Sequence, residues 1–269
     1  METHSRLQGE QAVRDSVREV YADIVTGRKA RCCSGRRAAA AGYDAADLAL
    51  LPDGANMGLS CGNPLAAADL REGQIVLDLG SGGGFDAFQA GVKVRAAGRV
   101  IGVDMTPEML RVARDGTRQY RERTGLDNVE FLPGEIERLP VADNSIDVVL
   151  SNCVINLSPD KARVWREIYR VLKPGGRVSI ADIALLKPLP LSVASTAKAL
   201  VGCVAGAVPV EETRAALEKT GFRSVVLRPE PEYMCGMRYD PLYKKIAEGL
   251  PSGENLEDYV VSLSISAEK

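Results

Sequence analysis

The sequence of 269 residues predicts an α/β fold with a doubly wound, mostly parallel sheet and a smaller C-terminal α+β lobe. Two observations carry this prediction. Five short apolar runs follow one another between residues 74 and 183, and helical patterns separate them. A glycine-rich turn follows the first run directly, as expected where a ligand binds at the carboxyl ends of parallel strands.

The five apolar runs are predicted strands, because a strand buried on both faces is apolar along its whole length. They span residues 74–80, 98–104, 128–134, 146–152 and 176–183. Thr106 with Pro107 and Ser158 with Pro159 match the residue preferences at helix N-termini. We therefore expect helices to begin at about residues 107 and 159.

The flanking segments are less regular. Valine and isoleucine recur at helical spacing over residues 11–26, which predicts an N-terminal helix. A short helical piece is expected near 43–50, helices at 192–202 and 209–220, and strands at 224–229 and 260–266. We divide the chain into an N-terminal helix with cysteine-bearing loops over the site (1–71), a core (72–183) and a C-terminal lobe (184–269).

Composition excludes several classes of protein. A net charge of −2, with no basic cluster interleaved with aromatic residues, argues against a nucleic-acid partner. The sequence has no apolar run of about 18 residues and no signal-like N-terminus, so no membrane association is expected. We expect a monomer in the cytoplasm, where cysteines stay reduced.

Six cysteines are the most unusual chemical feature of the chain: Cys32, Cys33, Cys61, Cys153, Cys203 and Cys235. A single cysteine is more often a small buried apolar residue than a ligand. Here, however, Cys153 ends the fourth predicted strand, Cys61 lies in a glycine-rich loop and Cys203 has small neighbours. Several thiols facing one pocket would suit a soft, thiophilic acceptor.

The only histidine is His4, in a terminal segment that we expect to be disordered. A histidine general base is therefore excluded, and so is a zinc site with a histidine ligand. An all-cysteine zinc site stays open.

The turn after the first strand predicts a nucleoside site. Asp78 ends the strand, and glycines at 80, 82 and 84 leave backbone N–H groups accessible. Asp104 ends the second strand, where its carboxylate can accept hydrogen bonds from both ribose hydroxyls. The alternative for Asp104 is a helix cap, although Thr106 already occupies the capping position. The third strand ends at Gly134, followed by Glu135 and Ile136, on another side of the same site.

The segments DLGSGGG (78–84), GVDMT (102–106), GEIERLPVADNSIDVVLSN (134–152) and RVLKPGG (170–176) resemble class I S-adenosylmethionine-dependent methyltransferases, which have a Rossmann-like fold. The resemblance covers roughly residues 72–183 and implies S-adenosylmethionine as cofactor. An acidic Asp78 suits the ammonium of its methionine part and would repel a pyrophosphate. The cofactor-binding residues implied are Asp78, Gly80, Ser81 and Gly82 for the methionine part, Asp104 for the ribose, Met105, Gly134, Glu135 and Ile136 for the adenine, and Asn152 beside them.

A narrower resemblance extends over nearly the whole chain. The cysteine pair at 32 and 33, CGNP (61–64), SNCVINLSPDK (151–161) and GCVAGAV (202–208) resemble arsenite methyltransferases. The resemblance implies methyl transfer to trivalent arsenic for detoxification, with Cys61, Cys153 and Cys203 as arsenic ligands. It also implies a further catalytic thiol at Cys32 or Cys33, and a thiol reductant, glutathione or thioredoxin, as co-substrate.

Two features depart from the family pattern. Tyr21 is followed by Ala22 where the family has a Tyr-Gly motif, and Cys235 has no counterpart. Two other functions are kept as alternatives: a methyltransferase for a quinone-like or sterol-like carbon or oxygen acceptor, and a non-enzymatic thiol protein that binds arsenite or zinc. The final methylation state of the product does not follow from the sequence.

Overall fold

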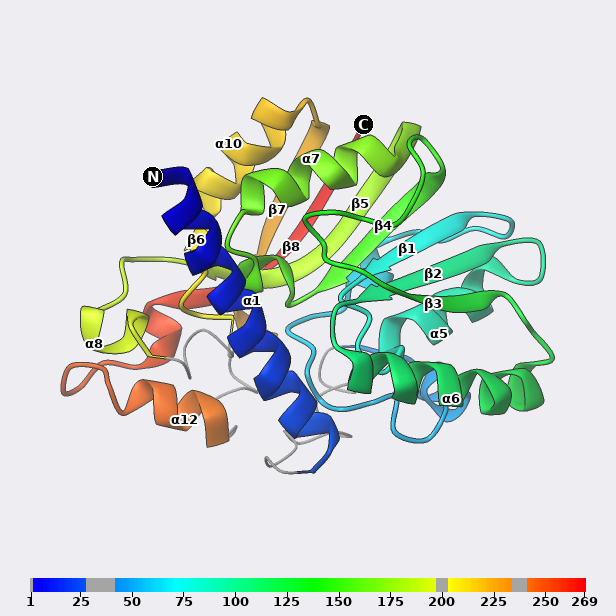
Figure 1. Ribbon diagram of the computed structural model, residues 1–269, viewed down its shortest axis with the longest axis horizontal. Coiled ribbons are helices and arrows are strands. Elements are labelled where there is room, and N and C mark those ends of the chain that lie inside the picture. Colours follow the sequence, from blue (N-terminus) through cyan, green and yellow to red (C-terminus); the bar gives the residue numbers. More distant parts are fainter. Residues whose placement is uncertain (1, 28–41, 197–202, 234–240) are drawn as a thin grey trace.

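The computed structural model describes residues 2–27, 42–196, 203–233 and 241–269 (Figure 1). Its described strands form one eight-stranded sheet in the order β3-β2-β1-β4-β5-β8-β7, with β6 pairing beside β5. β1 to β5 run parallel, and β8 pairs antiparallel with both β5 and β7. The strands are β1 Ile75–Leu79, β2 Arg99–Asp104, β3 Val129–Pro133, β4 Ile146–Asn152, β5 Leu172–Leu185, β6 Val208–Pro209, β7 Arg223–Glu230 and β8 Val260–Glu268.

Helices cover both faces of the sheet, which confirms the doubly wound α/β prediction. In Figure 1, α7 and α10 lie together at the top, and α5 and α6 lie together at the lower right. The described helices are α1 Glu2–Val25, α3 Ala45–Ala49, α4 Pro64–Ala67, α5 Phe85–Val94, α6 Pro107–Thr124, α7 Lys161–Val171, α8 Leu191–Ala194, α10 Val210–Thr220 and α12 Pro241–Ala247, with 3-10 turns η1 Ile155–Leu157 and η2 Leu256–Asp258.

Alternate residues of each strand pack into two separate cores, because successive side chains of a strand point to opposite faces of the sheet. Val76 and Val100 face Phe88 on the α5 and α6 side. Leu77 and Ile101 belong to the opposite core, with Trp165 of α7. The central strands are therefore apolar on both faces, which is why their sequence reads as continuous apolar runs.

The C-terminal segment completes the sheet. β8 pairs with β5 from Arg177 to Leu185, along most of that strand. The predicted division at residue 184 therefore falls within β5, and residues on both sides of it contribute to one core.

Several predicted boundaries are wrong in detail. α7 begins at Lys161 rather than at 159, with Asp160 as its N-cap. Its cap carboxylate accepts from Arg163 N at 3.0 Å. Ser158 Oγ donates to Glu137 at 2.6 Å and accepts from Asp160 N at 3.1 Å, so it orders the turn before the helix. β5 starts four residues before the predicted strand, at Leu172.

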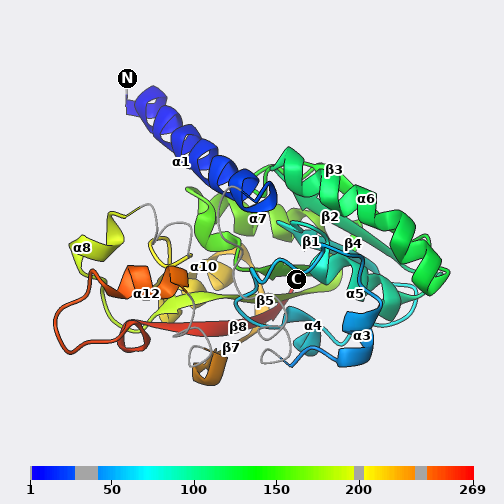
Figure 2. The same cartoon turned by 90° about the horizontal axis from the view of Figure 1, so that it is seen from below.

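The N-terminal segment containing His4 is helical, where disorder was expected. α1 extends away from the sheet at its N-terminal end (Figure 2). The predicted helix at 192–202 is only partly described, as α8; residues 197–202 lie outside the described part of the chain. Within the described residues, the model contains no helix with the length and apolarity needed to cross a membrane.

Candidate active site

A cavity with about 1060 Å³ of empty space, part of it open to solvent, lies at the carboxyl ends of β1, β2 and β4. In an open α/β sheet this edge is where ligands bind. Segments from α1, the 55–60 loop, the glycine turn, α6 and the β4–α7 connection surround it. Of the predicted cofactor residues it is lined by Asp78, Gly80, Ser81, Gly82, Asp104, Met105, Gly134, Ile136 and Asn152.

The glycine turn has the conformation that its sequence predicts. Gly80, Gly82 and Gly84 all have positive φ, at 63°, 51° and 89°. A Cβ on Gly82 would meet only Met109 Sδ, at 3.7 Å, so little blocks approach to this backbone. Ser81 Oγ is buried and has no hydrogen-bond partner among the described residues. The turn thus offers a ligand an unused hydroxyl and unobstructed space beside Gly82.

Three buried carboxyls surround the inner end of the cavity: Asp78, Asp86 and Asp104. Burial raises the pKa of Asp78 well above its ordinary value, and Asp86 and Asp104 raise it further by repulsion. Burial also raises the pKa of Asp86, to about 6, although hydrogen bonds from Tyr43 and Asn152 lower it. Within the described residues, no ion pair involves any of the three. Such a site suits a cationic ligand.

Asp104 has hydrogen-bond partners of its own. Its carboxylate accepts from Gly82 N at 2.9 Å and from Thr106 N at 2.8 Å. Thr106 is the N-cap residue of α6, but its side chain makes no capping bond. Asp104 therefore orders both the glycine turn and the start of α6. Part of its carboxylate is used in the way that the helix-cap alternative expects.

The outer end of the cavity lies under α1, and sequence reasoning missed the part that Arg14 plays there. Arg14 and Tyr21 of α1 both line the cavity. Arg14 Nε lies 3.4 Å from Glu137 and 3.7 Å from Glu135. Glu137 lines the cavity, whereas Glu135, predicted at the adenine, points toward α1 and is not part of the lining. The apolar stripe of α1 gave no signal for Arg14, which lies among its charged positions.

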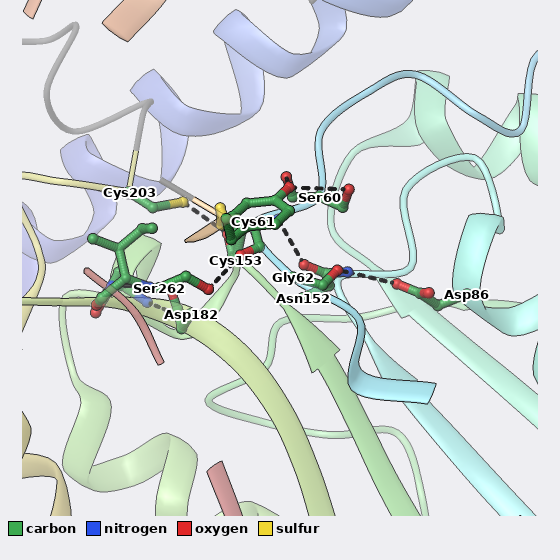
Figure 3. The surroundings of a disulfide bond; sticks show 12 residues. Ser60, Cys61, Gly62, Asp86, Asn152, Cys153, Asp182, Cys203 and Ser262 are labelled. Atoms are coloured by element: carbon green, nitrogen blue, oxygen red, sulfur yellow. Dashed lines mark hydrogen bonds between the residues drawn. A yellow bond between two sulfur atoms is a disulfide. The ribbon is translucent and has the colours of Figure 1, made fainter. Parts of the chain in front are cut away.

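Three of the six cysteines come together beside this cavity. The Sγ atoms of Cys61, Cys153 and Cys203 all lie within 4.8 Å of one another, and all three residues are buried (Figure 3). Cys61 and Cys153 form a disulfide, with Cα atoms 5.5 Å apart. This disulfide differs from the expectation that every cysteine is reduced; it joins two cysteines 92 residues apart in the sequence, which the fold brings together. Cys32, Cys33 and Cys235 lie outside the described residues.

Cys153 and Cys203 both have left-handed backbones, with φ of 59° and 60°. Positive φ is uncommon for residues other than glycine and costs on the order of 1–3 kcal/mol. Such strain is concentrated at functional sites, where the surrounding structure maintains it. Here Cys153 N donates to Ala181 O at 2.8 Å, and Cys203 Sγ donates to Cys153 O at 2.8 Å.

Cys203 is the free thiol of this group. Burial raises its pKa well above the ordinary value, Asp182 raises it further, and hydrogen bonding from Tyr21 and the charge of Lys161 lower it. Asp182 is itself buried, which raises its pKa to about 6. Its carboxylate accepts from Asn156 Nδ2 at 2.9 Å and fixes the turn against which the Cys203 segment packs.

Asn152 connects the thiols to the cavity. Its amide contacts the backbone of the Cys61 segment on one side and the Asp86 carboxylate on the other. Tyr43 donates to Asp86 at 2.7 Å. Neither Tyr43 nor Asp86 was predicted, because each becomes a site residue only through contacts between distant parts of the chain.

Comparison with known proteins agrees with this geometry. A family model described as a methyltransferase domain matches residues 70–228. An arsenite methyltransferase of Halobacterium salinarum is 43% identical over 95% of this chain, which spans 66% of that relative's length. Four further curated arsenite methyltransferases are matched over between 36% and 44% of their lengths.

A solved structure is also similar: an arsenic(III) S-adenosylmethionine methyltransferase from Chlamydomonas reinhardtii, with a TM-score of 0.62 and 36% identity, over 86% of this chain and 72% of that one. A ubiquinone/menaquinone C-methyltransferase of Klebsiella pneumoniae is 31% identical over 66% of this chain and 69% of its own length.

Proposed function

Because this chain belongs to the family of methyltransferase domains, we propose that it transfers methyl groups from S-adenosylmethionine to trivalent arsenic held by cysteine thiolates. The observation that supports this substrate is the proximity of the Sγ atoms of Cys61, Cys153 and Cys203 to one another beside the cofactor cavity. Trivalent arsenic is soft and prefers thiolates to oxygen ligands. The names of the arsenite methyltransferases that the chain resembles support the same substrate.

The residues of the cavity fit the cofactor. S-adenosylmethionine would supply an electrophilic methyl group on a sulfonium, and it also carries an ammonium. The buried carboxyls of Asp78 and Asp86 offer the negative charge that these cations need, and the open face of Gly82 admits a close ligand. Asp104, Met105, Gly134 and Ile136 would hold the nucleoside, with Glu135 outside the lining.

Methylation of trivalent arsenic needs no general base. The lone pair of trivalent arsenic is the nucleophile and carries no proton, so no side chain has to remove one. The Cys61–Cys153 disulfide must be reduced before both thiols can bind arsenic, and its re-formation releases two electrons. Two electrons are what a methylated pentavalent arsenic needs to return to the trivalent state. We therefore include a thiol reductant, glutathione or thioredoxin, as co-substrate.

Other parts of the proposal extend the sequence-based expectations. Cys32 or Cys33 would deliver arsenic to the buried thiols, the chain would act as a monomer in the cytoplasm, and the biological role would be arsenic detoxification. A quinone-like carbon acceptor stays as the second candidate, because the chain is also similar to a quinone C-methyltransferase. That candidate gives no role to the three gathered thiols.

The test is arsenic speciation after incubation with arsenite, S-adenosylmethionine and glutathione. Wild-type protein should form methylated arsenicals, and Cys153→Ser should lose at least 100-fold in rate, because a hydroxyl is a hard ligand that binds arsenic(III) poorly. S-adenosylmethionine affinity should change little, since Cys153 is assigned to the acceptor. Arsenite methylation at the wild-type rate by folded Cys153→Ser protein would contradict the proposal.

A further inference from the structure

The backbone of Cys61 is held by side chains rather than by secondary structure. Cys61 N donates to Asn152 Oδ1 at 2.9 Å, and Cys61 O accepts from Ser262 Oγ of β8 at 2.6 Å. The next carbonyl, of Gly62, accepts from Asn152 Nδ2 at 3.1 Å. Two side chains from different strands therefore fix the position of this half-cystine.

The Asn152 amide is itself oriented. Its Nδ2 also donates to Asp86 Oδ2 at 3.0 Å, and Tyr43 OH donates to Asp86 Oδ1 at 2.7 Å. A carboxylate accepts hydrogen bonds only, so the nitrogen of the amide must face Asp86 and its oxygen must face Cys61 N. Figure 3 shows Asn152 between Asp86 and the Cys61 segment. The network is buried on the Asp86 side and reaches the cofactor cavity.

The same strand end carries the other half-cystine. Asn152 directly precedes Cys153, so the residue that holds Cys61 belongs to the backbone that presents Cys153. Gly62 fits tightly beside β5, since a Cβ there would lie 2.7 Å from Ala181 Cβ. The Cys61 segment thus contacts β4, β5 and β8 together, and little movement away from Cys153 is available to it.

We propose that Asn152 and Ser262 are positioning residues that hold Cys61 against Cys153, with Asp86 and Tyr43 fixing the Asn152 amide. Anchoring raises the effective concentration of one thiol at the other, which favours the disulfide over the dithiol. The role in methylation rests on the proposed function. The thiol–disulfide equilibrium does not, because it can be measured without arsenic or cofactor.

The experiment equilibrates the full chain with glutathione redox buffers. Two glutathione thiols reduce the Cys61–Cys153 disulfide to two cysteine thiols and give one glutathione disulfide. Alkylation followed by peptide mass spectrometry measures the oxidised fraction of that pair. Asn152→Ala and Ser262→Ala should each shift the equilibrium toward the dithiol by about tenfold, or about 30 mV for this two-electron couple.

Two matched controls make the same kind of buried bond elsewhere. Ser179 Oγ donates at 2.6 Å to the carbonyl of Pro64, which lies three residues after Cys61 in the sequence. Asn128 Nδ2 donates to Gly91 O at 2.9 Å. Ser179→Ala and Asn128→Ala should lose thermal stability but keep the wild-type redox equilibrium. Unchanged equilibria in both Asn152→Ala and Ser262→Ala would overturn the proposal, as would equal shifts in the controls. Should Asn152→Ala fail to fold, Ser262→Ala alone decides it by the same criterion.

Discussion

When the buried carboxyls of Asp78 and Asp86 ionise, they destabilise the free protein but attract a cationic ligand. Burial raises both pKa values, so the folded protein holds these protons more tightly than the unfolded chain does. Stability from this source is present below the ordinary pKa and is lost as pH rises through the folded value. A bound cation stabilises the ionised forms instead and recovers part of that loss.

Asp86 makes S-adenosylmethionine binding pH-dependent. Its pKa is about 6 in the ligand-free protein, and its ionised form attracts the cofactor's positive charge. The charges of the cofactor itself change little between pH 5 and 7. Affinity should therefore rise about tenfold over this range, following the ionised fraction of Asp86. Calorimetric titration at several pH values measures it.

Asp182 provides the control, because its pKa is also raised to about 6 by burial but it does not line the cavity. Asp86→Asn should flatten the pH profile, and Asp182→Asn should retain it. A wild-type affinity that stays constant between pH 5 and 7 would exclude Asp86 as a charge partner of the cofactor.

At the scale of elements, the sequence predicts best where one rule decides the structure. The parallel strands β1 to β4 match their predicted positions within two residues, because burial on both faces leaves a continuous apolar run. The start of α7 was missed by two residues, because the Ser158 hydroxyl accepts from Asp160 N in the turn before the helix, and Asp160 caps the helix itself. The beginning of β5, with two glycines, reads as a turn and is ordered by its neighbours.

The site likewise contains residues that the sequence predicts and residues that it does not. The glycine turn and Asp104 are local signals that follow a strand, so they could be predicted. The network around Cys61 could not, because it joins residues 91 and 201 positions apart in the chain. Nothing near Ser262 or Asp86 in the sequence indicates that these side chains serve a distant cysteine.

The segment that carries Cys203 depends on a close contact with η1. A Cβ on Gly206 would overlap the Asn156 carbonyl oxygen, and Asn156 cannot yield easily because Asp182 binds its backbone N and its side chain. Gly206→Ala should therefore displace Cys203 from Cys61 and Cys153. Arsenite affinity, measured by equilibrium dialysis on the reduced protein, should fall by at least about tenfold, or about 1.4 kcal/mol.

S-adenosylmethionine affinity serves as the internal control for Gly206→Ala, since Gly206 does not line the cavity. It should change by less than about threefold. Unaltered arsenite affinity would mean that Cys203 contributes nothing to arsenic binding.

At the scale of the whole molecule, β5 joins the parallel half of the sheet to the C-terminal half. It pairs with β4 on one side and β8 on the other, so the two halves share one hydrogen-bonded layer. Leu263 of β8 and Trp165 of α7 belong to the same core. The thiol site needs this continuity, because Ser262 of β8 holds the backbone of Cys61.

Leu263→Ala tests whether the two halves unfold together. Leu263 is fully buried, so the free energy of unfolding should fall by about 2–5 kcal/mol. Trp165, the single tryptophan, reports on the other half of the molecule through its fluorescence. In urea, its transition and the far-UV circular dichroism transition should coincide and move together to lower denaturant.

Leu191→Ala, at a side chain 85% exposed, should leave both transitions at their wild-type urea concentrations. A Trp165 transition that does not respond to Leu263→Ala would show that the C-terminal segment unfolds separately from the core.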